Sequence, residues 1–275
     1  MTALEQLADL VGDGGVVVLS GAGLSTESGI PDYRGPSGLA RRATPMTLQT
    51  FRSGRAARQR YWARSHVGWR TIARAAPNEG HRAVESLQRA GVVDGIVTQN
   101  VDGLHQAAGA ADVLELHGSL DRVVCLDCGS RSGRDELDRR LLAANRGWRA
   151  AAVQVNLDGD VELSKDAVST FRVVDCGACG GVLKPDVVFF GENVPSARVD
   201  RAFALVEGAG CLLVLGSSLT VMSGYRFVLR AAKLGVPVAI VNEGVTRGDA
   251  QATVKVDARL GQVLPQLAVA VSQAA

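Results

Sequence analysis

The chain has little of several features that define common protein classes. It has no apolar run near the roughly 20 residues of a membrane-spanning helix, because its longest runs, Val16–Leu19 and Cys211–Leu215 among them, are strand-sized. Its 30 Lys and Arg nearly balance 28 Asp and Glu, for a net charge of +2. That balance argues against nucleic acid or a membrane surface as the main partner. With 8 prolines beside 32 glycines and 47% hydrophobic residues, the composition also excludes a disordered or collagen-like chain.

Targeting signals and disulfide pairing are also missing. Met1–Asp13 is an acidic amphipathic stretch with no basic region, so we expect neither a secretory nor an organelle-targeting signal. The 5 cysteines are an odd number, in a 275-residue chain that is long enough to build a core without disulfides. Four of them fall in C-x-x-C pairs, which favours a metal and a reducing compartment. We therefore expect a cytoplasmic protein.

Short β-branched runs alternate with helix-like stretches, a pattern typical of an α/β fold whose parallel sheet carries helices on both faces. We expect strands at Gly15–Ser20, Gly95–Thr98, Val113–Leu116, Val187–Phe190, Cys211–Leu215, Val236–Val241 and Thr253–Val256. We expect helices at Leu4–Leu10, His81–Ala90, Gly103–Ala108, Ala197–Glu207, Tyr225–Leu234 and Gln262–Ser272.

Two stretches interrupt this alternation. Residues 37–78 are rich in arginine and contain Phe51, Tyr61, Trp62 and Trp69 without a strand pattern. Residues 121–182 contain both C-x-x-C pairs around a polar, irregular middle. We expect a helical insertion at 37–78 and a zinc-binding insertion at 121–182. They should pack together as a smaller domain beside a Rossmann-like sheet domain made of residues 1–36, 79–120 and 183–275.

The first chemical motif follows the first expected strand and reads Gly21-Ala22-Gly23-Leu24-Ser25-Thr26. Glycines at a strand-to-helix turn let backbone N–H groups approach a pyrophosphate. Thr26 stands where the usual dehydrogenase fingerprint has its third glycine, so a tight turn without a ligand remains an alternative. The polar loop that follows, from Glu27 to Gly35, combines charge, proline and glycine, which is more typical of a functional loop than of an idle one.

Polar side chains also follow later strands. Gln99, Asn100 and Asp102 come after one strand and His117 after the next, where open α/β sheets bind their ligands. Asp102 could instead only cap the helix expected from Gly103. His117 could act as a general base because its reference pKa lies near neutral pH. For His66, His81 and His105 a surface or packing role is favoured.

The two cysteine pairs, Cys125-x-x-Cys128 and Cys176-x-x-Cys179, predict a tetrahedral zinc site. A structural site is favoured over a catalytic one, because four thiolates leave no position for water. A redox pair is the weaker alternative. The spacing between the pairs exceeds the usual one, so we expect an insertion on the zinc module, and Cys211 should be a buried strand residue.

Small hydrogen-bonding residues recur at the remaining strand ends. Gly216-Ser217-Ser218 and Asn242-Glu243-Gly244 each follow an apolar run, an arrangement that suits a dinucleotide lying across the sheet edge. Lys184–Glu192 contains a buried run that leads into an exposed turn, and for Val187 and Phe189 a plain core role is acceptable.

Taken together, these residues resemble the sirtuins over nearly the whole chain, and the motifs are highly specific. The segments that carry the resemblance are Gly21–Arg34, Gln99-Asn100-Val101-Asp102, His117-Gly118, the two C-x-x-C pairs, Val188-Phe189-Phe190-Gly191-Glu192, Gly216-Ser217-Ser218 and Asn242. The detail in Ser25–Arg34, Arg58–Arg64 and Gly159–Val161 looks like class II, the branch with the mitochondrial lipoamidase-type sirtuin. We expect a bacterial member.

The resemblance implies a Rossmann-like NAD-binding domain, a smaller zinc-binding and helical domain with one structural Zn²⁺, and an acyl-lysine protein or peptide threaded between them. It implies an NAD-dependent protein-lysine deacylase that releases nicotinamide and O-acyl-ADP-ribose, with His117 as the general base on a ribose hydroxyl. In that scheme Asn100 orients the ribose and a water, and Asp102 holds the nicotinamide carboxamide.

The resemblance also implies the remaining contacts. NAD would lie against Gly21, Ala22, Gly23, Ser25, Glu27, Asp32, Tyr33, Arg34, Gln99, Asn100, Val101, Asp102, Gly216, Ser217, Ser218, Asn242, Glu243, Gly244 and Leu260. The acyl tunnel would be walled by Tyr33, Val188, Phe190 and Val221, while Gly191 and Glu192 would pair with the substrate backbone as an added strand.

One departure bears on the acyl group. Desuccinylating relatives carry a tyrosine near Leu39, and leucine cannot bind an acidic acyl group, although Arg41 and Arg42 could attract a polar one. Two other functions stay open: protein mono-ADP-ribosyl transfer, and a non-catalytic NAD-binding scaffold, against which the intact polar set argues. We expect a monomer.

Overall fold

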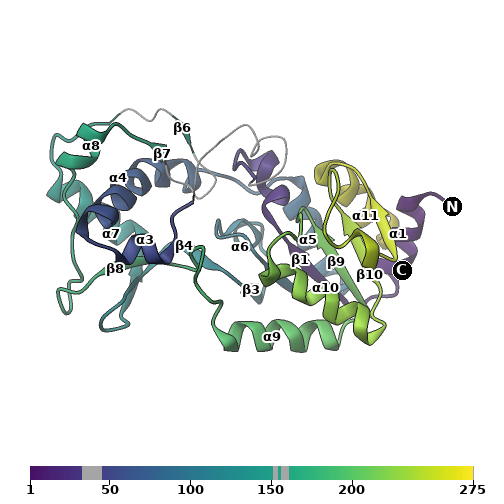
Figure 1. Ribbon diagram of the computed structural model, residues 1–275. Helices are drawn as coiled ribbons and strands as arrows, with labels where there is room; N and C mark the ends of the chain where they lie inside the picture. Colours follow the sequence, from purple (N-terminus) through teal and green to yellow (C-terminus); the bar gives the residue numbers. More distant parts are fainter. Residues whose placement is uncertain (33–44, 151–153, 156–160, 275) are drawn as a thin grey trace.

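The computed structural model describes residues 1–32, 45–150, 154–155 and 161–274. Figure 1 shows two groups of elements, with both chain termini in the group that contains the large sheet. The expected residues Tyr33, Arg34, Leu39, Arg41 and Arg42 lie outside the described part of the chain, as do residues 159–160. Among the helices that are described, none is long and apolar enough to cross a membrane.

The large sheet has six parallel strands in the order β11-β10-β9-β1-β2-β3. Their bounds are β1 Val16–Ser20, β2 Val93–Thr98, β3 Val113–Glu115, β9 Cys211–Leu215, β10 Val238–Val241 and β11 Val254–Val256. Because all strands run the same way, their carboxyl ends meet at one edge, which is where the polar motifs lie. The α/β fold class predicted from the sequence is confirmed.

Helices cover both faces of this sheet, so its central strands are apolar throughout. The flanking helices are α1 Ala3–Gly12, α5 Glu79–Arg89 and α11 Leu260–Ala274 on one face, and α9 Ser196–Glu207 and α10 Met222–Leu234 on the other. Val16 and Val18 pack toward α1, α5 and α11, whereas Val17 and Leu19 pack toward α9 and α10. This alternation makes every residue of β1 buried.

A second, antiparallel sheet of three strands has the order β5-β4-β8. It consists of β4 Gly118–Cys125, β5 Arg131–Gly133 and β8 Leu183–Val187, and a separate pair is formed by β6 Gln154–Val155 and β7 Val161–Glu162. The short elements that remain are the 3-10 turns η1 Ala22–Ser28 and η2 Asp249–Gln251 and the helix α6 Leu104–Ala107.

The predicted strand at Val187–Phe190 is wrong in extent and in partner. The strand ends at Val187 and pairs with β4 in the small sheet, since the hydrophobic run alone did not show which sheet it joins. The strand β4 was not predicted. The strand β4 crosses the expected boundary at 120, and β8, which lies wholly within the expected sheet-domain segment 183–275, pairs with it in the small sheet. The division of the chain into domains stays a prediction.

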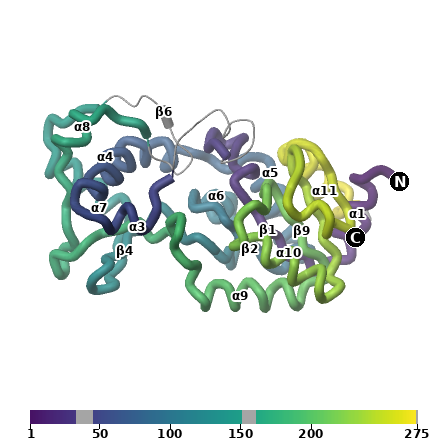
Figure 2. The backbone as a smooth tube through the Cα atoms, viewed as in Figure 1, coloured from purple at the N-terminus to yellow at the C-terminus, as the bar shows by residue number. Residues whose placement is uncertain are grey.

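The helices α3 Leu48–Arg52, α4 Arg55–Ile72, α7 Arg134–Ala144 and α8 Lys165–Thr170 pack with the small sheet, as Figure 2 also shows. Their core includes Arg134, a residue only 2% exposed. Its guanidinium lies 5.4 Å from the ring centroid of Trp62 and 5.2 Å from that of Trp69, and it pairs with Asp138 at 3.4 Å. The described part of the arginine-rich, aromatic segment contains the helices α3 and α4, and its Trp62 and Trp69 surround a buried cation. The irregular middle expected after residue 121 contains the regular helix α7.

The junction between the two sheets depends on Gly118. Its φ of +81° is in the left-handed region, and a Cβ there would lie 2.0 Å from the carbonyl oxygen of Asp186. We expect Gly118→Ala to lower the free energy of unfolding by about 3 kcal/mol or more, because the backbone strain and the clash add up. Urea denaturation measures this loss.

Gly147→Ala is the matched control, since Gly147 has a φ of +80° but no atom within 4 Å of its Cβ position. This variant should lower the free energy of unfolding by only about 1–2 kcal/mol, the strain of placing alanine in the left-handed region. Equal losses for the two variants would contradict the role of the Gly118 contact.

Candidate functional site

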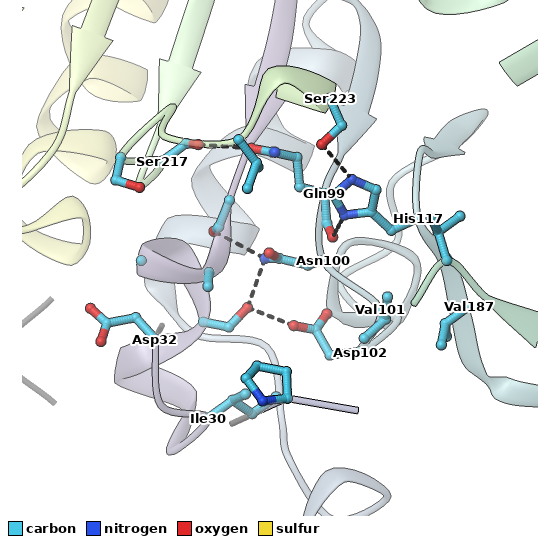
Figure 3. Close-up of a pocket in the computed structure, with 18 of the residues that line it drawn as sticks. Ile30, Asp32, Gln99, Asn100, Val101, Asp102, His117, Val187, Ser217 and Ser223 are labelled. Atoms are coloured by element: carbon cyan, nitrogen blue, oxygen red, sulfur yellow. Dashed lines mark hydrogen bonds between the residues drawn. The ribbon is translucent and has the colours of Figure 1, made fainter. Parts of the chain in front are cut away.

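A cavity of about 400 Å³ opens at the carboxyl ends of the parallel strands. Its walls come from the residues after β1, β2, β3, β9 and β10 and from the segment that follows β8. In Figure 3, Ser217 and Gln99 lie at the top, Asn100 and Asp102 lie in the middle, Ile30 lies below them, and Val187 lies at the right. The site thus has a polar part beside the large sheet and an apolar part toward the small one.

The loops after β1 and β9 meet through their backbones. Gly21 N donates to Leu215 O at 2.9 Å, and Gly23 N donates to Gly216 O at 2.8 Å. A Cβ at Gly23 would lie 2.8 Å from Gly216 O. These glycines are therefore needed for the contact between the two loops, and the Gly23 N–H already has a protein acceptor.

A buried amide connects the first loop to the second strand end. Asn100 Nδ2 donates to Gly21 O and to Ser25 Oγ, both at 3.1 Å. Ser25 in turn donates to Asp102 Oδ2 at 2.7 Å, as drawn in Figure 3. One chain of hydrogen bonds therefore fixes Asn100, Ser25 and Asp102 relative to one another.

Asp102 bonds the start of a helix and also faces the cavity. Its Oδ1 accepts from Leu104 N at 3.0 Å, at the start of α6, so it does satisfy a free helix N–H group. It also lines the cavity. Burial raises the pKa of this carboxyl above its usual value, although the bonds from Leu104 and Ser25 oppose the shift.

The ring of His117 is held at both nitrogens. Nδ1 lies 2.9 Å from the backbone oxygen of Gln99, and because a carbonyl only accepts, Nδ1 carries the proton. Nε2 lies 3.0 Å from Ser223 Oγ and is left with its lone pair. Burial lowers the pKa of His117 below its usual value, with a smaller lowering by Arg198, so the ring is neutral at pH 7 and can accept a proton at Nε2.

The backbone of His117 is fixed as well, because its carbonyl accepts from Val188 N at 2.8 Å. Gln99 links the same region to the β9 loop, since its Oε1 accepts from Ser217 Oγ at 2.7 Å. The ends of β2, β3 and β9 are thus joined directly around the histidine.

The segment after β8 forms the opposite wall. Lys184, only 3% exposed, pairs with Glu192 at 3.0 Å, and Glu192 Oε2 also accepts from Phe189 N at 2.9 Å. The carbonyl of Phe190 accepts from Leu48 N at 3.0 Å. The carboxylate of Glu192 therefore holds its own segment in shape.

The structure gathers most of the expected site residues in this cavity. Those that line it are Gly21, Ala22, Gly23, Ser25, Asp32, Gln99, Asn100, Val101, Asp102, His117, Val188, Phe190, Gly191, Glu192, Gly216, Ser217, Ser218, Val221, Asn242 and Glu243. The individual roles expected for them stay predictions.

Three expected residues do not line the cavity. Glu27 accepts from Gly261 N at 3.3 Å at the start of α11, and Gly244 N donates to Asp257 at 2.8 Å. Leu260 is a core residue, 7% exposed, which packs beneath Gly216. Local sequence could not show that the side chains of Glu27 and Leu260 turn away from the cavity, or that the Gly244 backbone is bonded to Asp257.

Other lining residues were missed. Ile30, Pro31, Met46, Tyr61, Ile72 and Leu120 form the apolar side, and Ser223 contacts His117. Ile30 and Pro31 stand inside the loop that the sequence marked as functional. Nothing in the local sequence distinguishes the others from ordinary core or helix residues.

The four cysteines of the two pairs form a cluster whose Sγ atoms all lie within 4.8 Å of one another. The Cys125–Cys179 and Cys128–Cys176 separations are 3.6 and 3.9 Å. Four thiolates about 2.3 Å from one zinc ion would be spaced at about 3.8 Å, so the set fits tetrahedral zinc. None of the four cysteines is among the residues that line the cavity, and four thiolates leave no ligand position for water, which favours a structural role. Cys211 is fully buried in β9.

Comparisons with known proteins agree over the whole chain. Residues 21–223 match the family model described as the Sir2 family. NAD-dependent protein deacetylase 1 of Streptomyces coelicolor is 61% identical over 267 residues, which are 97% of this chain and 89% of that protein. NAD-dependent protein deacetylase 1 of Mycobacterium avium is 52% identical, over 92% of this chain and 90% of that protein.

Solved structures share the fold. A solved structure that concerns the mechanism and regulation of Sir2 enzymes superposes on this chain with a TM-score of 0.79 at 30% identity. The superposition covers 99% of each chain. Sir2 with a p53 peptide and NAD⁺ gives 0.78 at 29% identity, with 97% of each chain covered. A histidine-to-alanine Sir2 variant with a deacetylated p53 peptide and 3′-O-acetyl ADP-ribose gives 0.78 at 28%, with 96% of each chain covered.

The cysteine cluster generates a test of its role. We expect one zinc per chain, and we expect its removal by a chelator to lower the Tm by at least about 5 °C, because a structural zinc site contributes folding free energy. Metal analysis by atomic emission and thermal unfolding measure the two quantities. Cys211→Ala, which changes the cysteine outside the cluster, should keep its zinc. A zinc-free protein with unchanged Tm would contradict a structural role.

Proposed function

This chain belongs to the Sir2 family, and we propose that it removes acyl groups from protein lysines at the cavity beside His117 while consuming NAD. NAD-dependent deacetylation is its activity, as in relatives of 48–61% identity over nearly the full length. The observation that supports this site is the neutral, doubly held His117, whose Nε2 lone pair lies in a cavity with Asn100, Asp102 and Gln99.

NAD fits the polar part of the cavity, and it supplies a ribose carbon from which nicotinamide can leave. The strand-end residues Gly21, Gln99, Ser217 and Asn242 would hold its ribose and adenosine parts. The Asp102 carboxyl, already fixed by Ser25 at 2.7 Å, would contact the carboxamide. The fixed geometry of these groups requires little rearrangement when the cofactor binds.

His117 takes a proton at Nε2 from a sugar hydroxyl. Burial keeps its pKa low, so the base is unprotonated at neutral pH, and the Gln99 carbonyl on Nδ1 stabilises the charge that forms on the ring. Asn100 orients the reacting sugar and a water through an amide whose direction is set by Gly21 and Ser25.

The acylated peptide would lie between the segment Gly191–Glu192 and Val221, extending the wall as an added strand. Its acyl chain would enter the apolar part of the cavity, lined by Ile30, Met46 and Ile72. This apolar wall supports the finer proposal of a class II, lipoamidase-like enzyme. The acidic residues that line the same cavity are Asp32, Asp102, Glu192 and Glu243, and they would disfavour an acidic acyl group.

The role of His117 is tested by His117→Ala. We expect NAD-dependent deacetylation to fall by about 100-fold or more, because the general base is lost, while NAD binding measured by calorimetry persists. Release of nicotinamide and of acyl-ADP-ribose is followed by mass spectrometry. Undiminished turnover in a folded variant would contradict the mechanism, and NAD binding by the wild type without nicotinamide release would support a scaffold instead.

Label transfer separates deacylation from ADP-ribosyl transfer. With adenylate-labelled NAD, we expect the label on soluble acyl-ADP-ribose and not on protein. Protein labelling that survives removal of all acyl-lysines would favour the transferase.

The acyl preference is tested with peptides that carry acetyl-, lipoyl-, biotinyl- or 3-hydroxy-3-methylglutaryl-lysine. We expect the uncharged acyl groups to give the higher kcat/KM, by about tenfold or more over the carboxylated one, because a carboxylate would be desolvated beside Asp32, Asp102 and Glu192. Preference for the carboxylated peptide would contradict the proposed acyl class.

A further inference from the structure

The contact between Ser223 and His117 is not explained by the motifs at the strand ends. Ser223 is in the first turn of α10, directly after the loop that contains Val221, and its Oγ lies 3.0 Å from Nε2 of His117. The two residues are 106 positions apart in the chain. No other described side chain shares a hydrogen bond with this ring.

The position of Ser223 is fixed by close packing. Gly224 packs so tightly that a Cβ would lie 2.6 Å from Nε2 of the Gln99 side chain. The backbone carbonyl of the same Gln99 accepts from His117 Nδ1. One residue, Gln99, therefore sets the histidine tautomer and the approach of the helix that brings Ser223 to the other nitrogen.

The chemistry of a hydroxyl suits this place. It donates to Nε2 when the ring is neutral, and after rotation about the Cβ–Oγ bond it accepts from Nε2–H when the ring is protonated. The bond to the charged ring is roughly twice as strong as the bond to the neutral ring. A serine here therefore favours proton uptake by a base that burial otherwise disfavours.

The charged groups near His117 do not take the place of the Ser223 hydroxyl as a hydrogen-bond partner of the ring. Arg198 on α9 opposes the protonated ring and lies 4.0 Å from Asp186 on β8. Glu115, at the end of β3, pairs with Arg122 on β4. Asp102 shares the cavity but is bonded to Ser25 and Leu104. Within the described part of the chain, no carboxylate hydrogen-bonds to His117.

We propose that Ser223 is a positioning residue for His117: its hydroxyl fixes the direction of Nε2 in the resting enzyme and accepts a hydrogen bond from the Nε2–H of the charged ring. The proposal rests on the proposed function of His117 as the base. No covalent bond to Ser223 is involved. Because Nε2 has a single lone pair, the Ser223 O–H turns away from it as the sugar hydroxyl approaches, and the serine oxygen accepts a hydrogen bond from Nε2–H once the proton has been transferred. The proton stays on Nε2 until it passes to product or solvent.

The test compares Ser223→Ala, Ser223→Thr and Ser196→Ala. Ser196 is an exposed serine in the first turn of α9 and serves as the matched control. The chain has 4 histidines, so NMR titration of ring-labelled protein, with His117→Ala used for assignment, follows the His117 pKa without any need for turnover. The kcat and KM for NAD are measured against pH on an acetylated peptide.

For Ser223→Ala we expect the His117 pKa to fall by about half a unit to one unit, because the charged ring loses a stronger hydrogen bond than the neutral ring does. The acidic limb of the plot of kcat against pH should shift to lower pH by the same amount. At pH 7.5 kcat should fall about 3- to 10-fold, with the KM for NAD changed less than twofold. Ser223→Thr should restore both values, and Ser196→Ala should match the wild type.

An unchanged or raised His117 pKa in Ser223→Ala, or a threonine variant that behaves like the alanine variant, would overturn the proposal. If the wild-type protein shows no NAD-dependent turnover, the proposed function is wrong, and the NMR titration of His117 still decides the role of Ser223.

Discussion

The contact between the β1 and β9 loops is the constraint on which the site depends. Gly23 N bonds Gly216 O at 2.8 Å, and a Cβ at Gly216 would lie 2.5 Å from Leu24 N. Since only backbone fits between the loops, the first turn after β1 is brought over the sheet edge. There Gly21 O and Ser25 Oγ can receive Asn100. The position of Asp102, which accepts from Ser25, follows from this one close approach.

His117 is held at the same edge by a second set of contacts. Gln99 holds His117 with its backbone, Ser217 with its side-chain oxygen, and the start of α10 with the surface of its side chain. Gly118 then lets β4 leave immediately after His117 and pair with β8. The cavity therefore lies at the junction of the two sheets, with a polar wall from one and an apolar wall from the other.

The sequence predicted the parts of the protein that local patterns encode. The strand ends, the cysteine pairs and the alternation of strands with helices are visible in short windows, and the resulting α/β fold and four-cysteine cluster are confirmed. The strand at Leu183–Val187 was predicted at the wrong residues and in the wrong sheet, because an apolar run does not show which strand it pairs with. The helices α4 and α7 were not located because their arginine-rich faces hide the apolar pattern.

The amino-acid order by itself thus determined which residues stand at the carboxyl ends of parallel strands, because strand period and turn chemistry are local properties. Only the tertiary structure decided that Glu27 and Leu260 face α11 and the core, that Met46 and Ile72 line the apolar wall, and that Ser223 reaches His117. Those contacts join distant segments, and their geometry depends on how the two sheets and their helices pack. The physical reason is that a side chain's neighbours across the fold are set by packing, which no short window of sequence contains.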